Sequence, residues 1–210
     1  MPSPAPSLAD RLRHDLEQGQ ILDQDRRYLM LRADVLMGLF AELEPAARAP
    51  ALRALGSSVR RHGAGSVQAY ALLLAEHHGA SEVSAAPAWA ATAPSPATQA
   101  LLGDMARAAA ALGWGVWEFE PDGQGLRLTV RNSPFAAAAR GLGLHGEPVC
   151  QAIAGMAAAL GQALWSVPAD VNECCAAQGP PGEPLRCVFQ LRPRGRDRGC
   201  GTNHLEETEP

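Results

Sequence analysis

Four of the five cysteines in this chain lie within one short stretch, between residues 148 and 189. They are Cys150, Cys174, Cys175 and Cys187. Cys150 opens an apolar segment of helical composition, Glu173 precedes the paired cysteines near the end of an expected strand, and Cys187 begins a returning strand. This layout brings thiols and a carboxylate near one point, which suits a closed four-coordinate zinc site. The spacing matches no short zinc-knuckle pattern, however, and buried free cysteines often act as small hydrophobic residues. The residues alone leave both interpretations open.

The composition predicts a helix-rich protein with one sizeable core or two small lobes. The chain has 210 residues, much of its apolar content is alanine, and aromatic residues make up only 5%. A net charge of −4, without a basic run in the body, argues against direct nucleic-acid binding. No apolar run approaches the ~20 residues of a membrane span, and the N-terminus lacks the pattern of a secretory signal. We therefore expect a cytoplasmic protein, in which clustered cysteines indicate metal or thiol chemistry rather than disulfides.

The elements that must position these residues can be predicted from periodicity. In the first half we expect a helix ending near Gln18, a hairpin over residues 21–31, and a helix opening at residue 33. Two further helices should cover residues 46–59 and 66–77.

The second half alternates helices and strands. We expect a helix over residues 99–112, a strand over 113–120, its partner over 126–130, and a helix over 150–164. On a regular strand Trp114 and Trp117 point to opposite faces, so at most one should face a pocket. The predicted division is an N-terminal tail with the start of a helix (1–15), a helical segment (16–80), an Ala/Pro-rich linker (81–97), an α+β domain (98–192) and a disordered tail (193–210).

Short motifs in both halves resemble a known family. The second half is similar to the 4-vinyl reductase domain in Leu112-Gly-Trp-Gly115, Val130-Arg-Asn-Ser133, Pro148-Val-Cys150, Cys175-Ala-Ala-Gln-Gly179 and Cys187-Val-Phe189. The first half resembles the segment that precedes this domain in the aromatic-sensing input domains of xylene- and phenol-responsive transcriptional activators. Its matching stretches are Gly19-Gln-Ile-Leu22, Arg27-Tyr-Leu-Met-Leu-Arg32, Val35-Leu-Met-Gly38 and Leu55-Gly-Ser-Ser-Val59.

The resemblance implies an α+β fold with an antiparallel sheet and several helices, a fold similar to subunits of the vesicle-tethering TRAPP complexes. It also implies a homodimer, a closed apolar pocket for small aromatic or hydrocarbon ligands, and a structural zinc ion. Carried over by motif, the zinc ligands are Cys150, Cys175 and Cys187, with Glu173 as the carboxylate. Counting back three residues from Cys175 gives Asn172 instead, so Glu173, Asn172 or Cys174 could occupy the fourth position.

The expected pocket differs from that of the phenol sensors. The family's tryptophan and histidine, which hold the phenol hydroxyl, correspond here to Val130 and to a helix that offers only Gln99. This argues against a phenol pocket. The predicted lining is Gln99, Met105, Trp114, Trp117, Val130, Phe135 and Ile153, an apolar wall with Gln99 as polar anchor. The alternative is that these residues are ordinary core.

These features predict a stand-alone ligand-binding module that signals to, or delivers its ligand to, a separate regulator or pathway enzyme. The activators' ATPase and DNA-binding modules are expected to be absent, because the chain stops after a basic, acidic-ended tail. The alternative is a non-catalytic accessory or scaffold protein of a biosynthetic pathway, including tetrapyrrole binding related to bacteriochlorophyll 8-vinyl reduction. No phosphate loop, nucleophile elbow or His-Glu metal helix is present, so catalysis is not the expectation.

Overall fold

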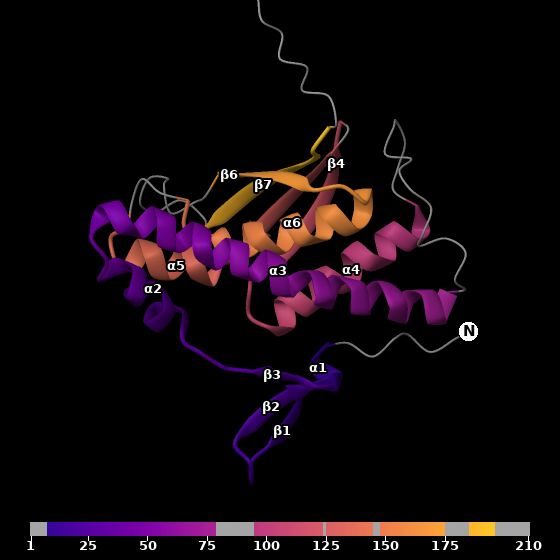
Figure 1. Cartoon of the computed structure of the whole chain (residues 1–210), viewed down its shortest axis with the longest axis horizontal. Helices are drawn as coiled ribbons and strands as arrows, with labels where there is room; N and C mark the ends of the chain where they lie inside the picture. The colour runs from indigo at the N-terminus through magenta and orange to yellow at the C-terminus, as the bar shows by residue number, and fades with distance from the viewer. Residues whose placement is uncertain (1–7, 79–94, 124, 145–147, 175–184, 196–210) are drawn as a thin grey trace, which may run out of the picture.

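The computed structural model describes residues 8–78, 95–123, 125–144, 148–174 and 185–195, which form helices and two antiparallel sheets (Figure 1). The helices are α1 (Leu8–Arg11), α2 (Ala33–Ala41), α3 (Pro45–His78), α4 (Pro96–Ala111), α5 (Pro134–Gly141) and α6 (Gln151–Trp165). The strands are β1 (Arg13–Asp15), β2 (Gln20–Asp23), β3 (Arg26–Tyr28), β4 (Val116–Asp122), β5 (Gly125–Arg131), β6 (Ala169–Cys174) and β7 (Arg186–Pro193). The predicted α+β fold is confirmed.

The larger sheet carries the main core. Its strands lie in the order β4-β5-β7-β6, and every neighbouring pair is antiparallel. One face is apolar because alternate residues such as Leu128 and Phe189 are fully buried, whereas the other face presents charged pairs such as Glu118–Arg131. Helix α6 packs against β6 and β7, α4 packs against β4, and α3 packs along α6 (Figure 1). The core therefore lies between the sheet and these helices.

Helix α3 is continuous, so the two shorter helices predicted over residues 46–77 are wrong. Its buried positions include Leu52, Gly56, Gly63 and Val67, and their helical spacing continues through the expected break. Glycine in a helix interior costs about 1 kcal/mol relative to alanine. At Gly63 the missing side chain instead makes room for a neighbour: a Cβ there would lie 2.9 Å from the Met156 Cε. Packing against α6 thus overrides the local tendency to break.

The N-terminal part forms a separate small sheet, β1-β2-β3. The predicted hairpin is confirmed, since β2 and β3 pair antiparallel. The predicted helix ending near Gln18 is wrong, because α1 ends at Arg11 and β1 follows. Arg11 Nε and Nη2 donate to the two carboxylate oxygens of buried Asp23 at 3.1 and 3.2 Å, and Nη2 also lies 3.2 Å from the Tyr70 hydroxyl. These bonds tie α1, the small sheet and α3 together.

Strand β4 begins at Val116, later than the predicted residue 113. Gly113 and Gly115 have φ angles of 74° and 94°, which are accessible to glycine and turn the chain around Trp114. A Cβ on Gly115 would lie 2.5 Å from the Arg131 carbonyl oxygen, so a side chain is also excluded sterically. The expectation that at most one of Trp114 and Trp117 faces a pocket is therefore wrong: Trp114 lies before the strand, and both residues line one cavity.

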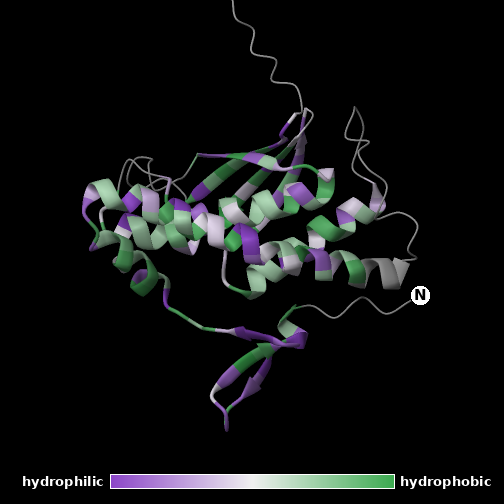
Figure 2. Ribbon diagram, in the orientation of Figure 1, coloured by the Kyte–Doolittle hydropathy of each residue, from purple (hydrophilic) through white to green (hydrophobic). Residues whose placement is uncertain are grey.

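Large apolar side chains are exposed along the connection from β3 into α2, which Figure 2 colours as hydrophobic. They are Leu29 (83% exposed), Met30 (77%), Leu31 (50%), Val35 (55%) and Leu39 (61%). Within the ranges given above, none of the helices combines the length and apolar character needed to cross a bilayer. The five exposed side chains named above are called the apolar patch of residues 29–39.

Candidate functional site

A cavity of about 300 Å³ lies between the small sheet and the main body of the chain. Strand β3 and helix α3 form one side of it, and α4 with the turn before β4 forms the other. Its apolar walls are built largely from aromatic rings and thioethers, namely Tyr28, Tyr70, Met105, Trp114, Trp117 and Met156. This volume falls at the lower end of the range for small-molecule sites, about 300–1,000 Å³.

The walls of this cavity are held by the core. Met105 and Trp117 are 3% and 4% exposed, so neither can turn away without disturbing the packing. Trp114 is half-buried, and the edge-on ring of Phe135 lies behind it with a centroid distance of 5.6 Å. Gly63 and the tip of Met156 complete the wall on the side of α3 and α6. The cavity is thus largely pre-formed.

The polar residues at this cavity are cationic or neutral. Arg26, Arg27 and His62 contribute to its lining, and none of the lining residues in the described part of the chain is an aspartate or glutamate. Arg26 donates to the Ser66 hydroxyl at 3.3 Å and to the Gly65 carbonyl at 3.1 Å, which are both neutral acceptors. Within the described residues, neither Arg26 nor Arg27 forms an ion pair. An arginine keeps its charge at all ordinary pH values, so the mouth of the cavity is positive.

The tyrosines of the cavity add no negative charge at neutral pH. Burial raises the pKa of Tyr28, and the negative charge of Asp23 raises it further. Burial also raises the pKa of Tyr70, and this outweighs the hydrogen bond from Arg11, which lowers it. For Arg11, burial acts to lower the pKa, but the hydrogen bonds with Asp23 and Tyr70 bring the pKa above its ordinary value. Both hydroxyls therefore remain neutral beside a charged arginine.

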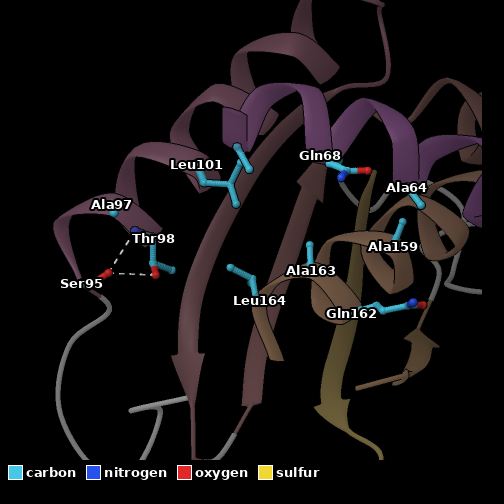
Figure 3. A pocket seen from close by; sticks show the side chains of 11 residues that line it. Ala64, Gln68, Ser95, Ala97, Thr98, Leu101, Ala159, Gln162, Ala163 and Leu164 are labelled. Atoms are coloured by element: carbon cyan, nitrogen blue, oxygen red, sulfur yellow. Dashed lines mark hydrogen bonds between the residues drawn. The ribbon is translucent and has the colours of Figure 1, made fainter. Parts of the chain in front are cut away.

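A second cavity of about 360 Å³ lies between α3, α4 and α6 (Figure 3). Its walls are mainly alanines with Leu101 and Leu164, and the amides of Gln68 and Gln162 stand at its edge. At one end Ser95, the N-cap of α4, accepts a hydrogen bond from the Thr98 amide at 3.2 Å. None of the described residues that line this cavity is aromatic. It therefore suits a ring-shaped apolar ligand less well than the first cavity.

The residues predicted for the ligand pocket fall into three groups. Met105, Trp114 and Trp117 line the first cavity together. Val130, Phe135 and Ile153 are buried in the core, and none of the three lines that cavity. Gln99 is exposed on α4 and lines neither cavity. A ligand-binding role for these residues stays a prediction.

Several residues of the first cavity were not anticipated from the sequence. They come from the N-terminal half and from α6, and include Arg26, Tyr28, His62, Tyr70 and Met156. The one local signal is the Arg26-Arg27-Tyr28 run on a strand, which places cationic and aromatic side chains together. Their meeting with Trp114, more than 80 residues away along the chain, depends on how the small sheet docks on α3.

Two of the predicted thiols meet at the inner face of the larger sheet. Cys150 is the N-cap of α6, Cys187 lies on β7, and their Sγ atoms are 3.4 Å apart in a fully buried setting. The Ser133 hydroxyl lies 3.2 Å from the Cys150 Sγ. Glu173, on β6, accepts from the Cys150 backbone amide at 2.8 Å and from Gln151 Nε2 at 2.7 Å. The carboxylate thus binds the N-terminus of α6, where the helix dipole favours negative charge.

These thiols are compatible with zinc ligation. Two sulfurs on one tetrahedral Zn²⁺, at about 2.3 Å each, would lie about 3.8 Å apart, close to the Cys150–Cys187 separation. Cys175, the third predicted thiolate, lies outside the described residues. Cys174 is within them and is exposed. Among the described residues, no group of three histidine, cysteine or acidic side chains is arranged to hold a metal ion.

Comparisons with known proteins place the fold. The sequence matches no protein-family description and no curated protein. Among solved structures, the chain is similar to the phenol-responsive sensory domain of the transcription activator PoxR with phenol, with a TM-score of 0.60 and 20% identity over 89% of this chain and 86% of that chain. It also matches a vinyl-4-reductase family protein from Methanocaldococcus jannaschii, with a TM-score of 0.40 and 13% identity over 78% of this chain and 91% of that chain. The resemblance predicted from the sequence is confirmed for the fold.

Proposed function

We propose that this chain is a sensor-type module that binds a small, mostly apolar, ring-containing molecule in the first cavity and signals to a separate partner. The observation that carries this proposal is the pre-formed hollow walled by Trp114, Trp117, Met105 and Met156. The sensory domain of PoxR, which shares the fold, has a structure with phenol, and this supports a ligand-sensing role.

The size of the cavity limits the ligand. An apolar cavity of about 150 Å³ accepts benzene. A hollow of about 300 Å³ therefore suits a molecule with one or two rings. Edge-to-face and stacked contacts with Trp114 and Trp117 would favour aromatic over aliphatic ligands, since each such ring pair adds about 0.5–1.5 kcal/mol beyond area burial.

Calorimetric titration with a neutral two-ring compound, 2-naphthamide, tests this proposal. Trp114→Ala should weaken binding about tenfold, because it removes one aromatic contact. Leu164→Ala is the matched control: Leu164 is also half-buried but lines the second cavity, so affinity should be unchanged. Native mass spectrometry of freshly purified protein would show whether an apolar ligand co-purifies. Absence of both binding and co-purification would reject the sensor role and favour the accessory or scaffold alternative.

We also propose that the chain pairs with a second copy of itself through the apolar patch of residues 29–39. Val35 and Leu39 are one helical turn apart on α2, so they present a continuous apolar surface. Analytical ultracentrifugation should show a dimer that Leu39→Glu converts to a monomer. A wild-type protein that is monomeric at all concentrations would contradict this.

We propose a structural zinc ion held by Cys150, Cys175, Cys187 and Glu173. The short Cys150–Cys187 separation supports it, and thiolate ligation at a buried site would contribute directly to folding energy. Metal analysis of purified protein should show one zinc that Cys150→Ser and Cys187→Ser remove. Cys174→Ser should retain the metal, whereas loss in that variant would assign the fourth position to Cys174. Equal metal content in the wild type and both buried-cysteine variants would exclude the site.

A further inference from the structure

We infer that the ligand of the first cavity carries an anionic group, and that its chemical class is an aromatic carboxylic acid whose carboxylate is bound by Arg26 and Arg27. This inference rests on the proposed function, because it names the kind of molecule that the same cavity accepts. The rings would contact Trp114 and Trp117 while the carboxylate lies at the positive mouth.

The residues that line the cavity carry more positive than negative charge. Arg26 and Arg27 line it without an acidic residue among the lining side chains. The charges of Asp23 and Asp104 act on the tyrosines of the cavity, but each of these carboxylates has its own arginine partner. Asp23, which is opposite Arg26 in the hairpin, binds Arg11, and Asp104 on α4 pairs with Arg107. The positive charge at the mouth is therefore not neutralised by these carboxylates.

Hydrogen bonds to α3 fix the side chain of Arg26 at the cavity. Its guanidinium is partly buried and is fixed against α3 by the Ser66 hydroxyl and the Gly65 carbonyl. These two bonds orient the side chain without cancelling its charge. A guanidinium has five N–H donors in a planar fork, so it can still bind a carboxylate after donating to two neutral acceptors. Beside an apolar wall such a bond is stronger than in water.

The other polar side chains that line the cavity carry no negative charge. Tyr28 and Tyr70 are neutral at physiological pH, and Ser66 and His62 complete the polar side. None of these groups repels an anion. A neutral hydrocarbon would bury against the rings but would leave the two arginines without a counter-charge. The combination of apolar wall and unneutralised cationic mouth matches an amphipathic anion better than a hydrocarbon or a phenol.

The test compares 2-naphthoate with 2-naphthamide, which is nearly the same shape but uncharged, by calorimetric titration of the full chain. Naphthoate should bind at least tenfold more tightly than the amide. Arg26→Gln and Arg27→Gln should each weaken naphthoate binding about tenfold and weaken amide binding by a clearly smaller factor, because the amide carbonyl can accept a hydrogen bond but carries no charge. Arg61→Gln, an exposed arginine of α3 outside the cavity lining, should change neither affinity.

The outcomes separate this inference from the proposed function. Equal affinity for acid and amide, or equal effects of the arginine variants on both, would overturn the anion inference while leaving the ligand-binding role intact. Binding of neither compound would overturn both. Circular dichroism of each variant shows whether it is folded, and Arg27→Gln, at an exposed position, keeps the test available if Arg26→Gln disturbs packing against α3.

Discussion

At the crossing of α3 and α6 two helix backbones lie so close that a single added methyl group should disturb the fold. Gly155 on α6 is buried against Gly56 on α3, and a Cβ added at Gly155 would lie 2.1 Å from the Gly56 carbonyl oxygen and 2.9 Å from its carbon. Ordinary van der Waals contact is 3.4–4 Å. The clashing atoms belong to a helix backbone, which cannot rotate away as a side chain can. Gly155→Ala therefore requires the two helices to move apart.

The expected loss of folding stability in Gly155→Ala is the difference between two opposing contributions. Overpacking in a close-packed interior costs typically about 1–3 kcal/mol. Replacing a helical glycine by alanine returns about 0.5–1 kcal/mol through the backbone entropy of the unfolded chain. The net free energy of unfolding should fall by up to about 2.5 kcal/mol, and a clash with backbone atoms favours the upper part of this range. The same substitution at an unhindered glycine should have the opposite sign.

Urea denaturation followed by tryptophan fluorescence measures this difference. Gly103→Ala on α4 is the matched control, because the nearest atom to its added Cβ is the end of Arg107 at an ordinary 3.5 Å. We expect Gly103→Ala to be more stable than the wild type by about 0.5–1 kcal/mol. If Gly155→Ala proved as stable as Gly103→Ala, the close crossing of α3 and α6 would be wrong.

Two further predictions concern the Arg11–Asp23–Tyr70 cluster. Asp23→Asn should lower the free energy of unfolding by about 2 kcal/mol in urea, because it leaves partly buried Arg11 without its charged acceptor; exposed Asp34→Asn is the control and should change little. Tyr70→Phe should reduce the loss of folding stability at alkaline pH. Burial raises the pKa of Tyr70 in the folded state, so the stability that its neutral hydroxyl contributes is present below about pH 10 and is lost as pH rises through the folded-state pKa. All 18 basic residues other than histidine are arginine, so no lysine titrates there. Urea midpoints at pH 8 and pH 10.5 that changed equally in both proteins would contradict this assignment.

Local patterns in the sequence were sufficient to predict most of the helices and strands and one long-range contact. The hairpin after residue 20 and the strands on either side of the Cys174–Cys187 connection follow from turn residues and alternation. The sequence also predicted that Cys150 and Cys187 lie close together. Cys150 is at the start of α6 and Cys187 is at the start of β7, which pairs with the strand that follows α6.

Other features depended on contacts that no local pattern encodes. Residues 46–77 contain three glycines, which favour a break, yet α3 continues because its buried stripe packs along α6. Glu173 was predicted as a zinc ligand, and the tertiary structure shows its carboxylate bonded to the start of α6. Whether it also binds metal remains a prediction.

The sequence by itself determined most of the element types and the apolar character of the interior, because these depend on side-chain period and on backbone preferences within a few residues. Only the tertiary structure decided that Trp114 and Trp117 share one cavity and that Arg26, Arg27 and Tyr28 close it. Two positive-φ glycines rotate Trp114 out of the strand, and the partly buried Arg11, bonded to both Asp23 and Tyr70, joins the small sheet to α3. The position of each side chain in the site therefore depends on residues far from it in the chain.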